Sequence, residues 1–160
     1  PPLQAEPIPL LPLLERLGAA LAKVYHDKGL ALQLSVDGAL RVAADEADLL
    51  ELLGNLLDNA CKYANSRVSI SAAALPQTAA GAAPLGHELL VHIDDDGPGV
   101  AAELRTIILE RGERADTAIP GQGLGLAIAC DILSSYRGQL QVSESPLGGA
   151  RFSLLLPARP

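Results

Sequence analysis

The chain has 160 residues, the size of one ordinary domain, and its hydrophobic fraction of 49% excludes a disordered chain. It carries a formal net charge of −7 and contains only three Tyr, one Phe and no Trp. These values argue against binding to nucleic acid or to an anionic membrane as the main activity. The two cysteines, Cys61 and Cys130, form no C-x-x-C pair, so metal and redox functions have little support.

No apolar run approaches the roughly 18 residues of a membrane span, and no signal peptide pattern opens the chain. We therefore expect a soluble, cytoplasmic polypeptide. Because Pro1 stands where an initiator Met would be, we also expect a fragment, which could be the soluble part of a membrane protein.

The N-terminal part begins with residues 1–12, which contain five prolines and are interpreted as a non-helical linker from an upstream domain. The folded domain is then expected over 13–160. Apolar residues at helical spacing predict a first helix over about 12–27. An alternating strand, the turn signal Asp37-Gly38 and a short second strand predict a hairpin over 31–43.

The central helix contains the stretch ELLGNLLDNACKY, residues 51–63, and Asp45 is its expected N-cap, with Asp48 completing an approximate capping box. Its helical periodicity separates two faces. The apolar face consists of Leu49, Leu53, Leu56, Leu57, Ala60 and Ala64. The polar face consists of Glu51, Asn55, Asp58, Asn59 and Lys62.

The remaining elements complete an α/β pattern. We expect strands over 67–75 and 88–94, a loop over 76–86, a helical turn over 103–110, a flexible segment over 111–122, a helix over 124–136, and two final strands over 139–144 and 150–156. This order predicts a two-layer sandwich, with a mixed, mostly antiparallel, five-stranded sheet and three helices on one face.

The polar face of the central helix suits a magnesium-nucleotide site. Asn59 offers an uncharged oxygen to a hard cation, Asn55 lies one turn earlier, and Lys62 places a positive charge where phosphates would lie. The helix alone supports a solvated surface equally well.

Two glycine-containing loops follow this helix. Asp95-Asp96-Gly97-Pro98-Gly99 ends a strand, and its fixed carboxylate could accept a hydrogen bond from the amine of adenine, although an acidic surface turn would have the same composition. The segment 121–126, GQGLGL, opens a helix whose N–H groups could hold phosphates. It is neither a Walker A loop nor a Rossmann fingerprint.

In this order, the three motifs resemble the ATP-binding domain of sensor histidine kinases, in the wider family of gyrase, Hsp90 and MutL with the Bergerat ATP-binding fold. The resemblance covers about residues 13–157. It matches Asn55 to Tyr63 to the N box, Asp95 to Gly99 to the G1 box and Gly121 to Leu126 to the G2 box. Segments 111–116 and 120–123 are most similar to PhoQ-type sensors.

The resemblance implies ATP and Mg²⁺ as cofactors and a role for each matched residue. Asn59 would ligate Mg²⁺, with Asn55 supporting the ion or the phosphates, and Asp95 would bind the adenine amine. Tyr63 would contact the base or ribose, Gly97 and Gly99 the base, and Lys62 the phosphates. Arg114 and Gln122 would contact the γ-phosphate. The lid that closes over ATP would be framed by Gly121, Gly123, Leu124, Gly125 and Leu126.

Two positions depart from the family pattern. The usual Phe-containing F box is replaced by Ile107-Ile108-Leu109-Glu110-Arg111, and Ile119 stands where PhoQ-type lids can carry a basic residue. The first departure leaves no Phe in this stretch through which the lid could dock. The second removes one potential contact with phosphate.

Asn55 distinguishes a kinase from an ATPase, because gyrase-like members carry a Glu general base at that position. We expect slow hydrolysis and transfer to a histidine on a separate dimerisation domain of the same protein, since structural roles are favoured for His26, His87 and His92. The expected assembly is a monomeric fragment of a homodimeric inner-membrane sensor that acts on a response regulator. A stand-alone ATPase and a non-catalytic nucleotide-binding regulatory module are the alternatives.

Overall fold

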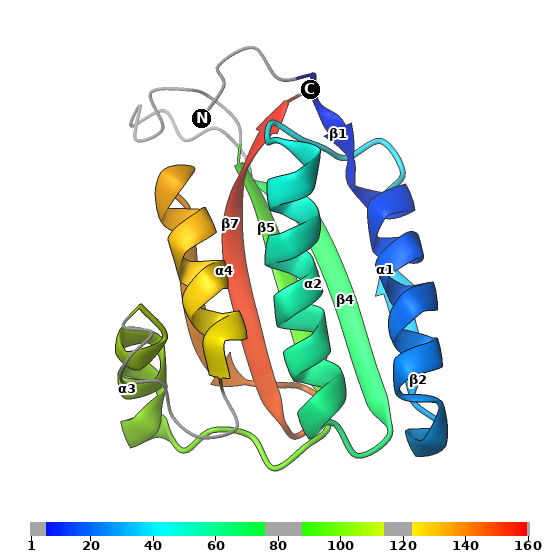
Figure 1. Ribbon diagram of the computed structural model, residues 1–160, viewed down its shortest axis with the longest axis vertical. Helices are drawn as coiled ribbons and strands as arrows, with labels where there is room; N and C mark the ends of the chain where they lie inside the picture. The colour runs from blue at the N-terminus through cyan, green and yellow to red at the C-terminus, as the bar shows by residue number, and fades with distance from the viewer. Residues whose placement is uncertain (1–5, 76–87, 114–122, 160) are drawn as a thin grey trace.

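The structure has one layer of β-sheet and one layer of helices packed on one face of that sheet (Figure 1). This computed structural model describes residues 6–75, 88–113 and 123–159, and the expected loop over 76–86 lies outside them. The described elements are β1 (Ile8–Pro9), α1 (Leu10–Val24), the 3₁₀ helix η1 (His26–Lys28), β2 (Ala31–Ser35), β3 (Arg41–Val42), α2 (Glu46–Tyr63), β4 (Arg67–Leu75), β5 (Glu88–Asp95), α3 (Ala102–Glu113), α4 (Gly123–Ser135), β6 (Gln139–Glu144) and β7 (Ala150–Arg159).

The sheet is mixed and mostly antiparallel, as the sequence predicts. Its order is β1-β3-β7-β5-β4-β2, with β6 also paired to β7, and β2 with β4 is the parallel pair. The five longer strands and the short β3 lie where the sequence predicts strands, whereas β1 was not expected. The described sheet therefore has seven strands rather than the predicted five.

The predicted hairpin over 31–43 is wrong. β2 pairs in parallel with β4, whereas β3 pairs with β1 and β7. The turn signal itself is satisfied locally, since Ala39 N–H donates to Asp37 Oδ1 at 2.8 Å. The pairing of β3 is instead explained by the burial of its side chain. Val42 is fully buried in the core where β3 pairs with β7, and pairing of β3 with β2 would remove Val42 from that position.

The first helix begins at Leu10, so residues 8–12 are not linker as predicted. Pro12 lies in the first helical turn, where a missing N–H has no consequence. The Leu10 N–H is satisfied by the carbonyl of Leu40 at 3.1 Å, and the Leu10 side chain is fully buried. The packed structure therefore begins at Ile8 rather than at residue 13.

The helix α2 lies over the middle of the sheet and runs along its strands (Figure 1), and the six apolar residues predicted for its buried face are all at most 2% exposed. Asp45 is the N-cap, accepting from Asp48 N–H at 3.2 Å. The other half of the expected capping box is replaced by Tyr136, whose hydroxyl accepts from Asp45 N–H at 3.0 Å and donates to Asp48 Oδ2 at 2.7 Å. The residue after α4 thus ties that helix to the start of α2.

The remaining difference concerns α3, which forms a fourth α-helix rather than a single turn. It continues through Glu113, so residues 111–113, which were expected to belong to the flexible segment, form the end of a helix, and residues 114–122 lie outside the described part. Ile108, within the altered F-box stretch, is 6% exposed and packs into the core. An aliphatic residue therefore anchors this helix.

Candidate functional site

The predicted residues of the N box and the G1 box meet at one small cavity. It has a volume of about 110 Å³ and lies where the end of α2 faces the end of β5 and the start of β7. The lining residues are Asn59, Tyr63, Asp95, Pro98, Gly99, Val100, Ala150 and Phe152. The site residues predicted from the sequence include Asn59, Tyr63, Asp95 and Gly99. They do not include the other lining residues, which are Pro98, Val100, Ala150 and Phe152.

Asp95 forms the polar part of the cavity wall and is only 2% exposed. Its Oδ1 accepts hydrogen bonds from the N–H groups of Gly97, at 2.9 Å, and Ala150, at 3.2 Å. Both bonds use the same oxygen, so within the described residues Oδ2 is available to a ligand. Burial raises the pKa of Asp95, the two backbone hydrogen bonds oppose this, and the nearby charges of Asp96 and Asp94 raise it further.

Two glycines allow the backbone to close around this carboxylate. A Cβ on Gly97 would overlap the carbonyl oxygen of Tyr63. A Cβ on Gly149 would overlap Asp95 Oδ1 and lie 2.6 Å from the nitrogen of Gly97. The end of α2, the loop after β5 and the turn before β7 therefore touch through main chain, which fixes the position of Asp95.

Asp96 stabilises the same region, and sequence reasoning did not single it out. Its carboxylate accepts from the N–H groups of Asn65, Ser66 and Arg67 at 2.8 to 3.2 Å and from Ser66 Oγ at 2.8 Å. Partial burial raises the pKa of Asp96, but these hydrogen bonds outweigh it and lower the pKa to about 2. The bonds connect the end of β5 to the loop between α2 and β4, contacts that are distant in sequence.

The start of α4 lies against the polar face of α2. The amide nitrogen of Asn55 donates to the carbonyl of Glu51 at 2.8 Å, and a Cβ on Gly125 would lie 3.2 Å from Asn55 Oδ1. Leu126 is 3% exposed and anchors the helix in the core. Asn55 of the N box and Gly125 of the G2 box are thus in contact.

The other predicted residues are less completely described. Lys62 is exposed, with its ammonium group 5.4 Å from the ring centroid of Tyr63. Gly123 and Leu124 begin α4. Arg114, Ile119, Gly121 and Gln122 lie outside the described residues, so their expected contacts with phosphate stay predictions.

The oxygen ligands available at this cavity are compatible with a magnesium ion that is already bound to the phosphates of a nucleotide. The described residues contain no group of three or more His, Cys, Asp or Glu that could hold a metal by itself. Asn59, on the cavity wall, offers one amide oxygen. Mg²⁺ commonly keeps several waters and binds substrate phosphates together with one or two protein ligands, so this sparse set is compatible with the ion.

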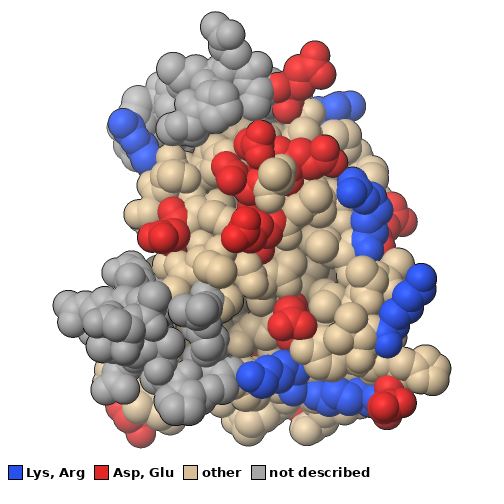
Figure 2. All heavy atoms as spheres, viewed as in Figure 1, with Lys and Arg blue, Asp and Glu red and all other residues tan. Residues whose placement is uncertain are grey.

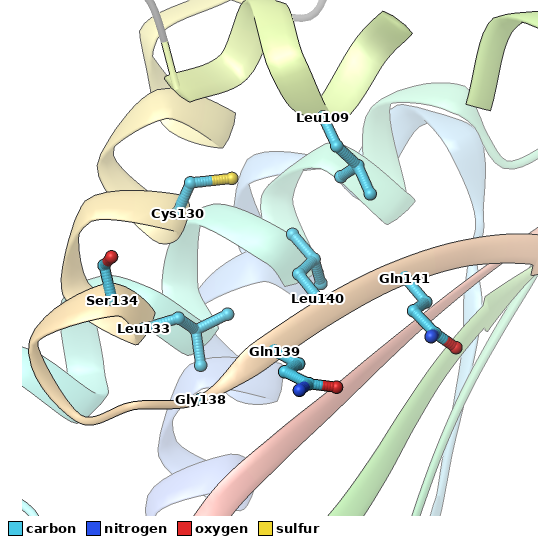
Figure 3. Close-up of a pocket in the computed structure, with 8 residues that line it drawn as sticks. All are labelled: Leu109, Cys130, Leu133, Ser134, Gly138, Gln139, Leu140 and Gln141. Carbon is cyan, nitrogen blue, oxygen red and sulfur yellow. The ribbon is translucent and has the colours of Figure 1, made fainter. Parts of the chain in front are cut away.

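A second cavity, of about 310 Å³, lies between α3, α4 and β6 (Figure 3). It is larger than the Asp95 cavity, but none of the described side chains lining it is charged. The labelled residues, including the half-buried Cys130, are also distinct from the predicted site residues. Size alone therefore does not identify the candidate site.

The histidines that are described have structural surroundings. His26 is exposed in η1, and His92 Nδ1 lies 2.8 Å from Ser153 Oγ on the sheet. Burial and the charge of Arg151 lower the pKa of His92, against the opposing effect of Asp94. His87 lies outside the described residues.

Comparison with known proteins assigns the family. Residues 44–160 match the family model described as "Histidine kinase-, DNA gyrase B-, and HSP90-like ATPase". Because this match covers most of the chain, the chain belongs to that family, as the three motifs indicate. It is an ATP-binding domain of the histidine kinase type.

The chain is similar to a part of two PhoQ sensors. It is 48% identical over 145 residues to the two-component sensor PhoQ of Pseudomonas aeruginosa, covering 91% of this chain and 30% of that protein. It is 40% identical over 147 residues to the sensor protein PhoQ of Escherichia coli, covering 92% and 28%. The chain thus spans about 30% of the length of these relatives. Within the described residues, no helix has the length and hydropathy needed to cross a membrane.

Solved structures give the same assignment. The ATP-binding domain of PrrB from Mycobacterium tuberculosis is 27% identical, with a TM-score of 0.72 and coverage of 98% of this chain and 100% of that chain. Full-length ShkA in complex with AMPPNP is 26% identical, with a TM-score of 0.74 and coverage of 98% and 32%. The described fold is therefore that of histidine kinase ATP-binding domains.

Proposed function

We propose that this chain is the catalytic domain of a PhoQ-type sensor histidine kinase, which binds Mg²⁺-ATP and transfers the γ-phosphate to a histidine on a separate dimerisation domain of the same protein. The observation that carries the proposal is Asp95. Its buried carboxylate is fixed through Oδ1 and faces a cavity that is also lined by Asn59 and Tyr63.

The fixed orientation of Asp95 supports selection of adenine. Because Oδ1 is occupied by two N–H groups, Oδ2 is the atom presented to a base, and it is an acceptor. The exocyclic amine of adenine is a donor, whereas guanine presents a carbonyl oxygen at the corresponding position. Tyr63 and Gly99 then flank the base or ribose, and Gly97 allows the close approach of the loop.

The phosphates and Mg²⁺ lie toward Asn59, Asn55 and Lys62 in this proposal. When bound, Mg²⁺ neutralises phosphate charge, and the chain positions the nucleotide for in-line transfer. Gly121, Gly123 and Gly125 frame the lid with Leu124 and Leu126, while Arg114 and Gln122 contact the γ-phosphate. The contact of Gly125 with Asn55 supports this arrangement, because it joins the lid helix to the N box.

Phosphotransfer is favoured over hydrolysis by the chemistry of α2. Asn55 cannot act as a general base, and its amide nitrogen donates to the carbonyl of Glu51. Glu51 lies eight residues before Asn59, about 12 Å along the helix axis. Neither Asn55 nor Glu51 therefore offers a positioned base to an attacking water.

The acceptor histidine belongs to another domain. His26 is exposed in η1 and is not among the residues lining the Asp95 cavity, and His92 is engaged with Ser153. We propose that the chain is a cytoplasmic domain of an inner-membrane sensor, monomeric as a fragment and homodimeric in the full-length protein. The phosphate then passes to a response regulator.

Isothermal titration calorimetry with Mg²⁺-ATP and Mg²⁺-GTP tests the nucleotide assignment. The variants are Asp95→Asn and, as a matched control, Asp131→Asn, which removes an exposed carboxylate from α4. Asparagine at 95 keeps an oxygen for the two N–H groups and places an amide donor where Oδ2 was. We expect binding of ATP but little of GTP by the unmodified chain and the control, and loss of ATP binding in Asp95→Asn.

Other outcomes would redirect the proposal. Absence of ATP binding in the unmodified chain would favour a non-catalytic module. ATP turnover by the chain alone, at a rate comparable to that with an added histidine-containing dimerisation domain, would favour the stand-alone ATPase. Transfer of radiolabelled γ-phosphate to the added domain, lost with Asn59→Ala, would support the kinase.

A further inference from the structure

The segment between α1 and β2 holds the last turn of α2. Lys28 Nζ donates to the carbonyl of Cys61 at 2.8 Å and to the carbonyl of Lys62 at 2.7 Å. Tyr25 Oη donates to Asp58 Oδ1 at 2.7 Å, and Lys28 Nζ lies 5.8 Å from the centroid of the Tyr25 ring. A lysine more than 30 residues away in sequence therefore caps the C-terminus of this helix.

The capped turn is the part of α2 that reaches the Asp95 cavity. Asn59 and Tyr63 line that cavity, and the carbonyl of Tyr63 is packed against Gly97. Lys28 thus holds the same turn without lining the cavity. A charged group bonded to this turn therefore also changes the electrostatic potential inside the cavity, where a nucleotide would bind.

The last turn of α2 carries negative charge, which disfavours binding of a polyanion next to it. The last carbonyl groups of a helix lack helical partners and form the negative end of its dipole. Asp58 adds a carboxylate in the same turn. Figure 2 shows acidic groups over the upper part of α2 and Lys and Arg groups along the lower edge, where the helix ends. Lys28 supplies a cation that is bonded directly to two of these carbonyls.

We propose that Lys28 is a positioning residue for the phosphates of the nucleotide: its ammonium group neutralises the negative end of α2 and so favours phosphate binding without contacting the base. This inference rests on the proposed function. It predicts that the contribution of Lys28 grows with the number of phosphates on the ligand. A residue that only held the fold together would affect adenosine and ATP equally.

Titration calorimetry with adenosine, ADP and Mg²⁺-ATP at about 150 mM salt separates these effects, because remote exposed charges are largely screened there. Lys28→Met removes the charge and keeps an unbranched stem, and Lys28→Arg restores the charge. Tyr25→Phe removes the bond to Asp58 without changing the charge. Lys23→Met is the matched control, since Lys23 is exposed in the last turn of α1.

We expect Lys28→Met to weaken ATP binding by about three- to tenfold, ADP binding by less, and adenosine binding by under about twofold. Lys28→Arg, Tyr25→Phe and Lys23→Met should each keep the ratio of ATP to adenosine affinity within about twofold of the unmodified chain. A thermal melt of each variant reports stability separately from this ratio.

One result would overturn the inference. An unchanged ratio of ATP to adenosine affinity in Lys28→Met, whether both affinities fall together or neither changes, would show that the lysine has no effect specific to phosphate. If the unmodified chain binds ATP normally, that result refutes this inference and leaves the proposed function intact. If the unmodified chain bound no ATP, the proposed function would fail first, and this inference with it.

Discussion

Replacing Asp96 with Asn should produce a loss of stability that depends on pH. Four hydrogen-bond donors from residues 65–67 lower its pKa from 3.8 to about 2. At 1.36 kcal/mol per pKa unit, this difference corresponds to about 2.4 kcal/mol. Because the carboxylate is partly exposed, solvent screening reduces the expected contribution to about 1 kcal/mol.

The sign follows from linkage. The pKa of Asp96 is lower in the folded than in the unfolded chain, so its contribution is fully present above about pH 4 and is lost as the pH falls toward about 2. Asp96→Asn should therefore be less stable than the unmodified chain by about 1 kcal/mol at pH 7, and the difference should shrink toward pH 3.

Urea denaturation followed by far-UV circular dichroism at pH 7, 5, 4 and 3 measures this difference. Asp131→Asn is the control, because Asp131 is exposed on α4 and accepts no hydrogen bond from the described residues. A difference at pH 3 as large as that at pH 7, or no difference at pH 7, would refute the argument that the charged carboxylate is what these donors stabilise.

Three other substitutions have expected outcomes. Gly149→Ala should displace Asp95, because the new Cβ would overlap its Oδ1; we expect a loss of about 1–3 kcal/mol in urea denaturation and loss of ATP binding in calorimetry. Gly54→Ala, whose Cβ would make an ordinary contact 3.6 Å from Leu17, should instead stabilise α2 by about 0.5–1 kcal/mol, and equal effects of the two substitutions would contradict the packing argument. Tyr136→Phe should cost about 1–2 kcal/mol by removing the hydroxyl that bonds to Asp48; a melting temperature equal to that of the unmodified chain would show that the bridge contributes nothing.

The features that could be predicted from the sequence depend on local patterns. The apolar periodicity of α2 fixes which face is buried, and the glycine spacing of the loop over 95–99 locates the cavity next to that helix. Asn59, Tyr63 and Asp95 were therefore accessible to sequence reasoning. The family resemblance depends on the same residues and agrees with the comparisons.

What could not be predicted depends on contacts between distant segments. The turn at Asp37 and Gly38 has hairpin chemistry, yet the strand after it pairs with β7 because Val42 is buried there. Likewise, nothing near Tyr136 in the sequence indicates that it completes the cap of α2. Asp96 looks like part of an acidic turn until the three N–H groups from the loop after α2 are seen around it.

The parallel pairing of β2 with β4 also constrains the order in which the sheet can assemble. Ala31 is paired with Arg67, and the connection between these strands includes the whole of α2. Parallel neighbours require such a crossover, so β2 cannot be secured before α2 and β4 are present. β2 is an edge strand of the described sheet, and it contributes no residue to the Asp95 cavity, so the last strand to be secured is not one that forms the site.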